Sequence, residues 1–314
     1  LSRSFFSRVI EGIQAEAERC DYSVLFAETH DSVEKERELV ELFVGQWVDG
    51  IILASSTNAG RDYSDYVARL ASLSKQGTHI PVVTLEFPLE SGGIDAVCID
   101  HERAAHDAVE QLIRLGRTRI AHISHPAGNL IGSWRIAGYR RAMAEAGLDC
   151  GDEADLASGA ITREEALELV ELLFVKVNGT VTLDDYATAT CFAGFPQAVN
   201  ITIGGVKPDG VFCANDQTAI GVIKYCEDRG LRIPEDVAII GTDDIFVASI
   251  MSPSLSTVDV PKFQLGRQAM ALLAERIAAG ESSYARRIEY LNYSIVERES
   301  TRRGAKPPLQ IFEW

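Results

Sequence analysis

Positive charge is scarce in this sequence. Lysine and arginine together number 30 against 46 aspartate and glutamate residues, so the formal net charge at pH 7 is −16. A protein that grips nucleic acid or an anionic membrane needs a positively charged surface. The composition therefore argues against direct binding of either one by this chain, and DNA would have to be held by a separate segment.

Long apolar runs are also missing. No stretch approaches the roughly 20 apolar residues of a membrane-spanning helix, and the first residues lack the basic start and apolar core of a signal peptide. Cysteine is sparse, shows no CxxC spacing and lies in part within apolar periodic segments, which indicates buried free thiols in a reducing cytoplasm. The six cysteines are Cys20, Cys98, Cys150, Cys191, Cys213 and Cys226.

Signatures of catalysis are absent too. The sequence has no Gly-x-Ser-x-Gly elbow, no P-loop and no GxGxxG motif that opens a helix after a strand. Of its six histidines, His101 and His106 stand five residues apart, which fits one helical face poorly. His122 and His125 straddle the end of a predicted strand. We therefore predict no enzyme, no metal site and no cofactor.

What the sequence does contain is a sustained alternation of strand-like and helix-like segments over 314 residues, more than one core usually holds. Such a rhythm predicts an α/β fold with two open, doubly wound parallel sheets, one in each lobe. The strands are predicted at Tyr22–Ala27, Val48–Leu53, Ile80–Leu85, Val97–Ile99, Ile120–Ile123, Gly210–Ala214, Val237–Ile240 and within Arg287–Val296. The helices are predicted at Phe6–Ala17, Glu34–Phe43, Tyr63–Lys75, Glu102–Leu115, Trp134–Ala146 and Phe263–Ala278.

The stretch Asp209–Ile245 is the most informative part of the chain, because it reads as strand, helix, strand with polar residues after each strand. Ligands of open parallel sheets sit beyond the carboxyl ends of the strands, which makes Asn215 and Asp243 candidate ligand contacts. An alternative is that Asn215 and Asp216 only cap the helix and that Asp243 and Asp244 only form a turn. Of these residues, Asp216 is the one we expect to cap the helix.

Six short motifs together resemble the effector-binding region of the lactose-repressor and galactose-repressor (LacI/GalR) family of transcription factors. Each motif is weak alone, but all six occur in the order and at about the spacing of the family, over nearly the whole chain. They are Phe5-Phe6 with Ile10–Ile13, Val48–Leu53, Leu115–Ala121, Arg135–Tyr139, Ala214–Asp216 and Gly241–Ile245.

The resemblance implies two similar α/β lobes of the type I periplasmic-binding-protein kind, joined by three crossovers, with an effector between them. The first lobe would comprise residues 1–99 and 262–286, and the second lobe residues 100–257 and 287–300. We expect the crossovers near 99–100, 257–261 and 287–292. Residues 301–314 read as a basic, proline-containing tail.

The resemblance also implies ligand-binding positions in the first lobe. Phe6, and with it Phe5, matches the aromatic side chain that packs on the effector's ring, although both could equally be first-turn core residues. Glu86 stands where many relatives have an aspartate at the end of a strand. Ser55 and Ser56 end another strand of this lobe.

In the second lobe, Arg135 matches the arginine whose planar fork binds two effector oxygens. Asp243 matches the acid that accepts hydroxyl hydrogens, and Asn215 the amide that both donates and accepts. Ile131, with Asn129, occupies a loop that varies with the effector. Ile161 stands where several relatives have an aromatic residue.

Two departures from the family pattern stand out. Relatives begin with a helix-turn-helix DNA-binding head, a hinge helix and a first strand, none of which precedes the Phe5-Phe6 segment in this sequence. We expect the natural protein to supply them upstream and operator DNA to be bound through that head. The segment 174–206 is longer than the usual link and contains extra strand or loop material.

The sequence thus predicts a cytoplasmic, homodimeric regulator that acts as a repressor, in which a small effector, a sugar or sugar derivative, changes DNA binding allosterically. A stand-alone periplasmic sugar-binding protein would share the fold and is the alternative. The scattered cysteines and the motif Arg135–Tyr139 favour the regulator.

Overall fold

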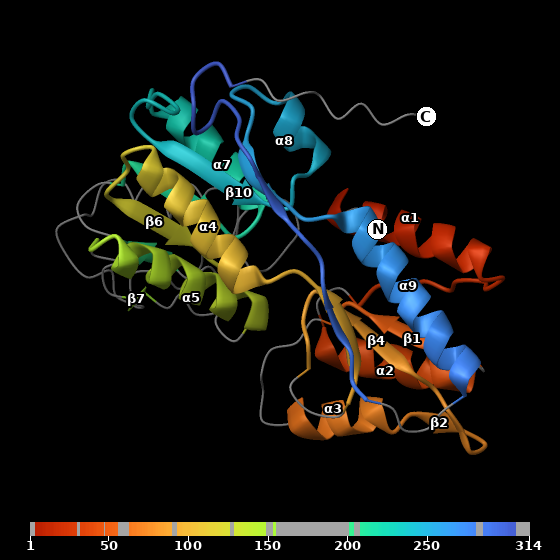
Figure 1. Ribbon diagram of the computed structural model, residues 1–314. Helices are drawn as coiled ribbons and strands as arrows, with labels where there is room; N and C mark the ends of the chain where they lie inside the picture. The colour runs from red at the N-terminus through yellow and green to blue at the C-terminus, as the bar shows by residue number, and fades with distance from the viewer. Residues whose placement is uncertain are drawn as a thin grey trace. The chain divides into compact units, whose positions relative to one another are not determined.

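The computed structural model describes residues 4–29, 32–46, 48–55, 63–89, 93–125, 129–148, 153–154, 201–203, 208–280 and 285–305 (Figure 1). The chain folds into two compact units. Unit 1 contains Leu1–Asp100 and Pro261–Asn292, and unit 2 contains His101–Val260 and Tyr293–Trp314. Both units are α/β, with sheets made mainly of parallel strands, which confirms the predicted fold class.

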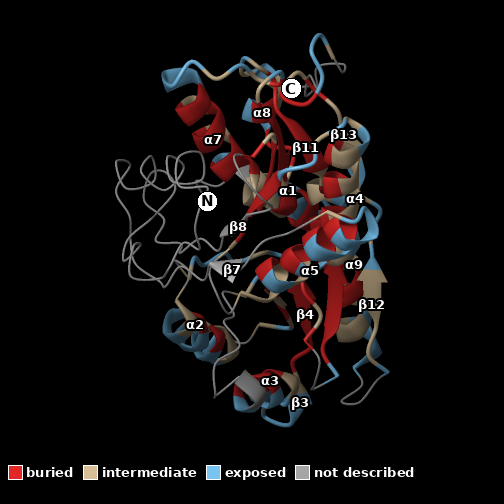
Figure 2. Cartoon of the chain, turned by 90° about the vertical axis from the view of Figure 1, so that its left-hand side faces the viewer, coloured by how far each residue is buried: buried red, intermediate tan, exposed pale blue. Residues whose placement is uncertain are grey.

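Unit 1 is built on a four-stranded parallel sheet with the strand order β1-β4-β5-β12. Strand β4 is buried along its length (Figure 2), as is β5, which is expected when helices cover a parallel sheet; the edge strand β12 is half-buried to exposed. The strands are β1 (Ile51–Leu53), β4 (Val82–Leu85), β5 (Asp95–Cys98) and β12 (Ile288–Tyr290). The helices are α1 (Ser4–Arg19), α2 (Val33–Gly45), α3 (Tyr63–Ala71) and α9 (Lys262–Ala279).

Helices α1 and α9 touch each other at their backbones through two glycines. A Cβ atom on Gly12 would lie 2.0 Å from the carbonyl oxygen of Phe263, and one on Gly266 would lie 1.9 Å from that of Val9. No side chain fits at such distances, so glycine is required at both positions. The close approach brings Val9 and Leu265 into the same core cluster.

Two local predictions for unit 1 are wrong. Segment 22–27 is extended but forms no strand, since no described segment pairs with it, and Leu25 and Phe26 are 63% and 41% exposed. The helix predicted to reach Lys75 ends at Ala71 instead. Strands β2 (Ser74–Lys75) and β3 (Thr78–His79) then form a hairpin. Its two turn residues, Gln76 and Gly77, have positive φ, as such a two-residue turn favours.

Unit 2 contains a seven-stranded sheet with the order β13-β11-β10-β9-β6-β8-β7, parallel from β11 to β6 and antiparallel at both edges. Its strands are β6 (Ile120–Ile123), β7 (Glu153–Ala154), β8 (Ile201–Ile203), β9 (Gly210–Cys213), β10 (Ala238–Thr242), β11 (Ser256–Asp259) and β13 (Ser294–Val296). Its helices are α4 (His101–Arg114), α5 (Leu130–Glu145), α7 (Asp216–Asp228) and α8 (Phe246–Ile250).

Helices cover both faces of this sheet. Ala121 and Ile123 on β6 pack into a core cluster with residues of α7. His122, between them, points to the other face and stacks on Tyr139 of α5, with 5.5 Å between ring centroids. Burial lowers the pKa of His122 to about 3, so this imidazole is neutral and structural.

The end of the chain differs from the prediction. We expected one strand within Arg287–Val296, in the second lobe, but the region forms two strands in different units. Strand β12 pairs in parallel with β5 of unit 1, and β13 pairs antiparallel to β11 of unit 2, because the chain passes from one unit to the other after Asn292. Thr301 is only 3% exposed and its hydroxyl lies 2.6 Å from that of Ser256, whereas residues 302–304, at the start of the predicted tail, are exposed.

Most of the extra segment 174–206 lies outside the described residues. Its described part is β8, which adds an antiparallel strand next to β6. In the described ranges, no helix is both long enough and apolar enough to cross a membrane.

Candidate functional site

Two acids that follow buried strands have a strained backbone. Glu86 follows β4 in unit 1 with φ 71°, and Asp243 follows β10 in unit 2 with φ 113°. A residue other than glycine in this region costs of order 1–3 kcal/mol, and such strain is concentrated at binding and catalytic sites. Both acids were predicted to contact a ligand, and both lie at the carboxyl end of a parallel strand, where ligands of such sheets bind.

Arg135 lies on α5 and is 4% exposed. Its guanidinium donates hydrogen bonds to the carbonyl oxygen of Ala214 and to Nε2 of His125, the latter at 3.0 Å, and lies 3.5 Å from Nδ1 of His101. Ala214 immediately follows β9, so Arg135 ties the end of that strand to α5. A ligand that binds this guanidinium would have to replace these protein partners of Arg135 with its own oxygen atoms.

Asn215 is the N-cap of α7, because its side-chain oxygen accepts a hydrogen bond from the Thr218 amide at 2.8 Å. The capping interpretation is therefore correct for Asn215, and its amide nitrogen is the group that remains for a ligand. Asn129 caps α5 in the same way, through the Gly132 amide at 2.8 Å. Ile131, in the first turn of α5, is partly buried.

The other predicted residues of unit 1 have structural partners. Phe5 and Phe6 contact each other edge to face with centroids 5.2 Å apart, and Phe5 packs on the core between α1 and α9. The hydroxyl of Ser55 donates to the buried carboxylate of Glu36 at 2.8 Å, as does the hydroxyl of Tyr66. Ser56 and Ile161 lie outside the described residues.

Asp216 has a different role from the helix cap that we predicted. It is fully buried, its Oδ2 accepts the Ile245 amide at 2.8 Å, and its Oδ1 accepts the Thr257 hydroxyl at 2.6 Å. Burial and the neighbouring carboxylates of Asp243 and Asp244 raise the pKa of Asp216 well above its usual range. Through these two hydrogen bonds the carboxyl group holds the turn after β10.

The same turn is anchored on its other side by a buried ion pair that the sequence did not suggest. Asp244, with φ 50°, lies 2.7 Å from the guanidinium of Arg298, and both side chains are 2% exposed. Arg298 also donates to the carbonyl oxygen of Leu255 at 2.8 Å. The two residues are 54 positions apart in the sequence, and no motif links them.

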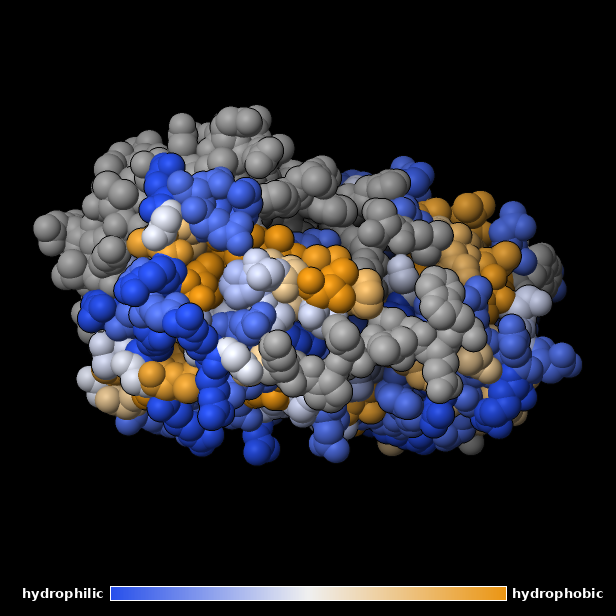
Figure 3. All heavy atoms as spheres, turned by 90° about the horizontal axis from the view of Figure 1, so that it is seen from above, coloured by the Kyte–Doolittle hydropathy of each residue, from blue (hydrophilic) through white to orange (hydrophobic). Residues whose placement is uncertain are grey.

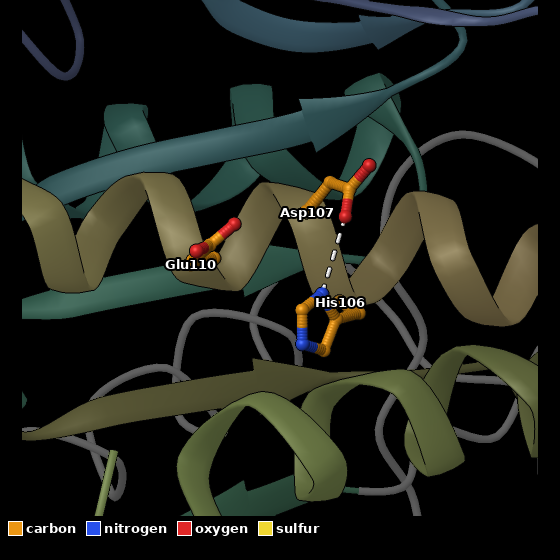
Figure 4. Close-up of side chains that lie close together, drawn as sticks. All are labelled: His106, Asp107 and Glu110. Carbon is orange, nitrogen blue, oxygen red and sulfur yellow. Dashed lines mark hydrogen bonds and ion pairs between the residues drawn. The ribbon is translucent and has the colours of Figure 1, made fainter. Parts of the chain in front are cut away.

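One group of side chains in the described part of the chain has donor atoms close enough for a metal ion: His106, Asp107 and Glu110 on α4, within 4.8 Å of one another (Figure 4). However, Nδ1 of His106 lies 3.1 Å from Asp107 and Nε2 lies 2.9 Å from Glu145 on α5. Burial lowers the pKa of His106, but these two carboxylates outweigh it and the pKa is raised overall. The group is better suited to an imidazolium that joins α4 to α5 than to a metal.

The sequence matches two family patterns. Residues 1–190 match the family described as periplasmic binding proteins and sugar binding domain of LacI family, and residues 109–301 match the periplasmic binding protein-like domain. Together the two patterns cover both units.

Individual relatives agree with the family patterns. The HTH-type transcriptional repressor PurR of Vibrio campbellii is 30% identical over 95% of this chain and 78% of its own length. Catabolite control protein A of Priestia megaterium is 29% identical over 96% of this chain and 79% of its own. A solved structure of a putative LacI-family transcriptional regulator from Sanguibacter keddieii has a TM-score of 0.70 and 31% identity, and 96% of each chain is covered.

These relatives favour a regulator over a stand-alone sugar-binding protein. The two repressor relatives align with 95% and 96% of this chain, and the solved regulator structure shares its fold over 96% of it. The chain therefore belongs to the LacI family of transcriptional regulators, of which it carries the effector-sensing region.

Proposed function

We propose that the chain binds a sugar or sugar derivative and that this binding controls how an attached DNA-binding head holds operator DNA. The observation that carries the proposal is the strained acid at a strand end in each unit, Glu86 after β4 and Asp243 after β10. Ionised carboxylates accept hydrogen bonds from hydroxyl groups, which a sugar supplies in number. The family description, which names a sugar binding domain, supports the same class of ligand.

The other proposed contacts supply complementary chemistry. The amide nitrogen of Asn215 would donate to a ligand oxygen, Arg135 would bind two oxygens at once, and an aromatic face at Phe6 would pack on a ring. Ile131 would set the size of the group that fits beside them. Phe5, Ser55 and Ile161 remain predicted members of the site.

A thermal-shift screen tests the proposed ligand class. Sugars, sugar phosphates and nucleobases would be added one at a time to the chain. A compound at 100 times its Kd is expected to stabilise the folded chain by about 2.7 kcal/mol, which raises the unfolding midpoint by several degrees. A nucleobase that shifts the midpoint while every sugar fails would replace sugar as the ligand class, and a panel without any shift would contradict the proposal.

We also propose that the chain forms a homodimer through α8. Phe246, Val247 and Ile250 on this short helix are 49%, 44% and 54% exposed, which is unusual for large apolar side chains grouped on one element. Apolar side chains also reach the surface on the face seen in Figure 3. A twofold dimer buries one such patch against its own copy.

Replacing Ile250 with glutamate is expected to convert the dimer to a monomer at micromolar concentration, because two charged carboxylates would be buried against each other. Sedimentation velocity measures the change. Leu42→Glu on α2 is the matched control, since Leu42 is 51% exposed but belongs to unit 1. An Ile250→Glu variant that stays dimeric, or a monomeric native chain, would remove α8 from the interface.

A further inference from the structure

Asp216 reaches from the end of one strand to its second neighbour across the sheet. It is the first residue of α7, shortly after the end of β9, while the hydroxyl that it binds belongs to Thr257 on β11, and β10 lies between these two strands. Its other oxygen accepts the backbone amide of Ile245, just beyond the end of β10. The carboxyl group therefore bridges the carboxyl end of β10 and holds the chain that leaves it.

The position of this carboxyl group beside β10 depends on a glycine in that strand. A Cβ atom on Gly241 of β10 would lie 2.3 Å from Oδ1 of Asp216. Only glycine leaves room for the carboxyl group to cross β10 at this point. Thr257 completes the arrangement, because its oxygen also accepts the amide of Asp244 at 3.3 Å.

The segment held in this way contains the two residues with left-handed backbone, Asp243 at φ 113° and Asp244 at φ 50°. Strained residues persist only when the surrounding contacts over-determine them. The turn has contacts on each side: the Asp216 carboxyl and the Thr257 hydroxyl on one, and the ion pair of Asp244 with Arg298 on the other.

We propose that Asp216 is the positioning residue of the effector site: through its hydrogen bonds with Ile245 and Thr257, its carboxyl group holds the turn that presents Asp243 to the ligand. This inference rests on the proposed role of Asp243 in effector binding. The charged groups that face Asp216 are Asp243 and Asp244 from the turn, and Asp244 is in turn ion-paired with Arg298.

The proposal distinguishes Asp216→Asn from Asp216→Ala. The asparagine oxygen can accept the Ile245 amide, and its NH₂ group can face Thr257, whose hydroxyl can turn toward the carbonyl oxygen of Val258, 3.4 Å away. Alanine leaves the Ile245 amide buried without its acceptor. Amide hydrogen exchange of Ile245, measured by NMR without ligand, is expected to be native-like in Asp216→Asn and at least about tenfold faster in Asp216→Ala.

Two further measurements separate positioning from general stability. A carboxyl group with a raised pKa keeps its proton in the folded chain after the unfolded chain has lost it, so stability falls as pH rises between the two pKa values. The Asp216→Asn variant should lack this part of the loss of stability with rising pH. If Asp216→Ala does not fold, Thr257→Val is expected to speed Ile245 exchange in its place, and Thr257→Ser to restore it. Asp228→Ala, at the exposed end of α7, is the matched control.

Each outcome has a defined meaning. Native-like Ile245 exchange in Asp216→Ala, or in Thr257→Val where Asp216→Ala does not fold, would overturn the inference, and so would exchange in Asp216→Asn as fast as in Asp216→Ala. Affinity for the panel compound with the largest midpoint shift should follow the exchange results. If exchange changes as expected while Asp243→Ala leaves that affinity unaltered, the turn is held as described but Asp243 is not a ligand contact, and the proposed effector site fails instead.

Discussion

Replacing Arg298 with methionine is expected to lower the free energy of unfolding of unit 2 by about 3–5 kcal/mol, since the variant leaves a buried carboxylate without its counterion. Arg298 and Asp244 form an ion pair at 2.7 Å with both side chains 2% exposed. Methionine keeps much of the volume of arginine, so most of the loss reports the charge and its hydrogen bonds. Urea denaturation followed by circular dichroism measures it.

Two further variants make this result specific. Arg298→Met combined with Asp244→Asn is expected to recover part of the loss, because no buried charge then remains uncompensated. Arg303→Met is the matched control for a surface pair: Arg303 lies 3.2 Å from Glu235 but is 86% exposed, and its loss should cost less than about 1 kcal/mol. A loss below about 1 kcal/mol in Arg298→Met itself would show that the buried pair does not hold the turn.

Replacing Asp243 with alanine is expected to weaken effector binding by more than about tenfold, the loss of one charged hydrogen-bond partner, while the fold stays intact. Asp243 is partly exposed at the carboxyl end of β10, so its removal opens no buried cavity. Isothermal titration calorimetry with the compound found in the thermal-shift screen measures the affinity. Unchanged affinity would remove Asp243 from the site.

The backbone at Asp243 calls for a second variant. Its φ of 113° is strained for alanine, so the alanine variant can weaken binding by moving the turn as well as by removing the carboxylate. Asp243→Asn keeps the size and tolerance of positive φ while removing the charge, and it should weaken binding to a similar extent. A native-like affinity in Asp243→Asn would mean that the ligand needs the shape of the turn and not its charge.

Elements buried on both faces were predictable from the sequence. Strand β6 has the predicted limits, and β9 and β10 lie within one or two residues of theirs, because an apolar run between polar ends has few alternatives inside a covered parallel sheet. Segment 22–27 has a similar composition but forms no strand. A strand exists only where a neighbour completes its hydrogen bonds, and that is a property of the fold and not of the segment.

The candidate site divides in the same way. Strand ends and polar residue types indicated Asn215 and Asp243, and the order of six motifs indicated the LacI family. The backbone strain at Glu86 and Asp243 was not visible, since φ depends on what holds the turn. Asp216 was taken for a helix cap because its sequence position suits one, whereas its side chain bonds to residues 29 and 41 positions away.

The sequence by itself determined the α/β class, the family and the strand ends at which polar residues gather, since these depend on local apolar periodicity and on residue type along the chain. Only the tertiary structure decided which strands pair at the sheet edges, that β12 and β13 belong to different units, and that Asp216 and the Arg298–Asp244 pair hold the turn before α8. The physical reason is that pairing, burial and the pKa of a carboxyl group are set by neighbours distant in the sequence, which folding alone brings together.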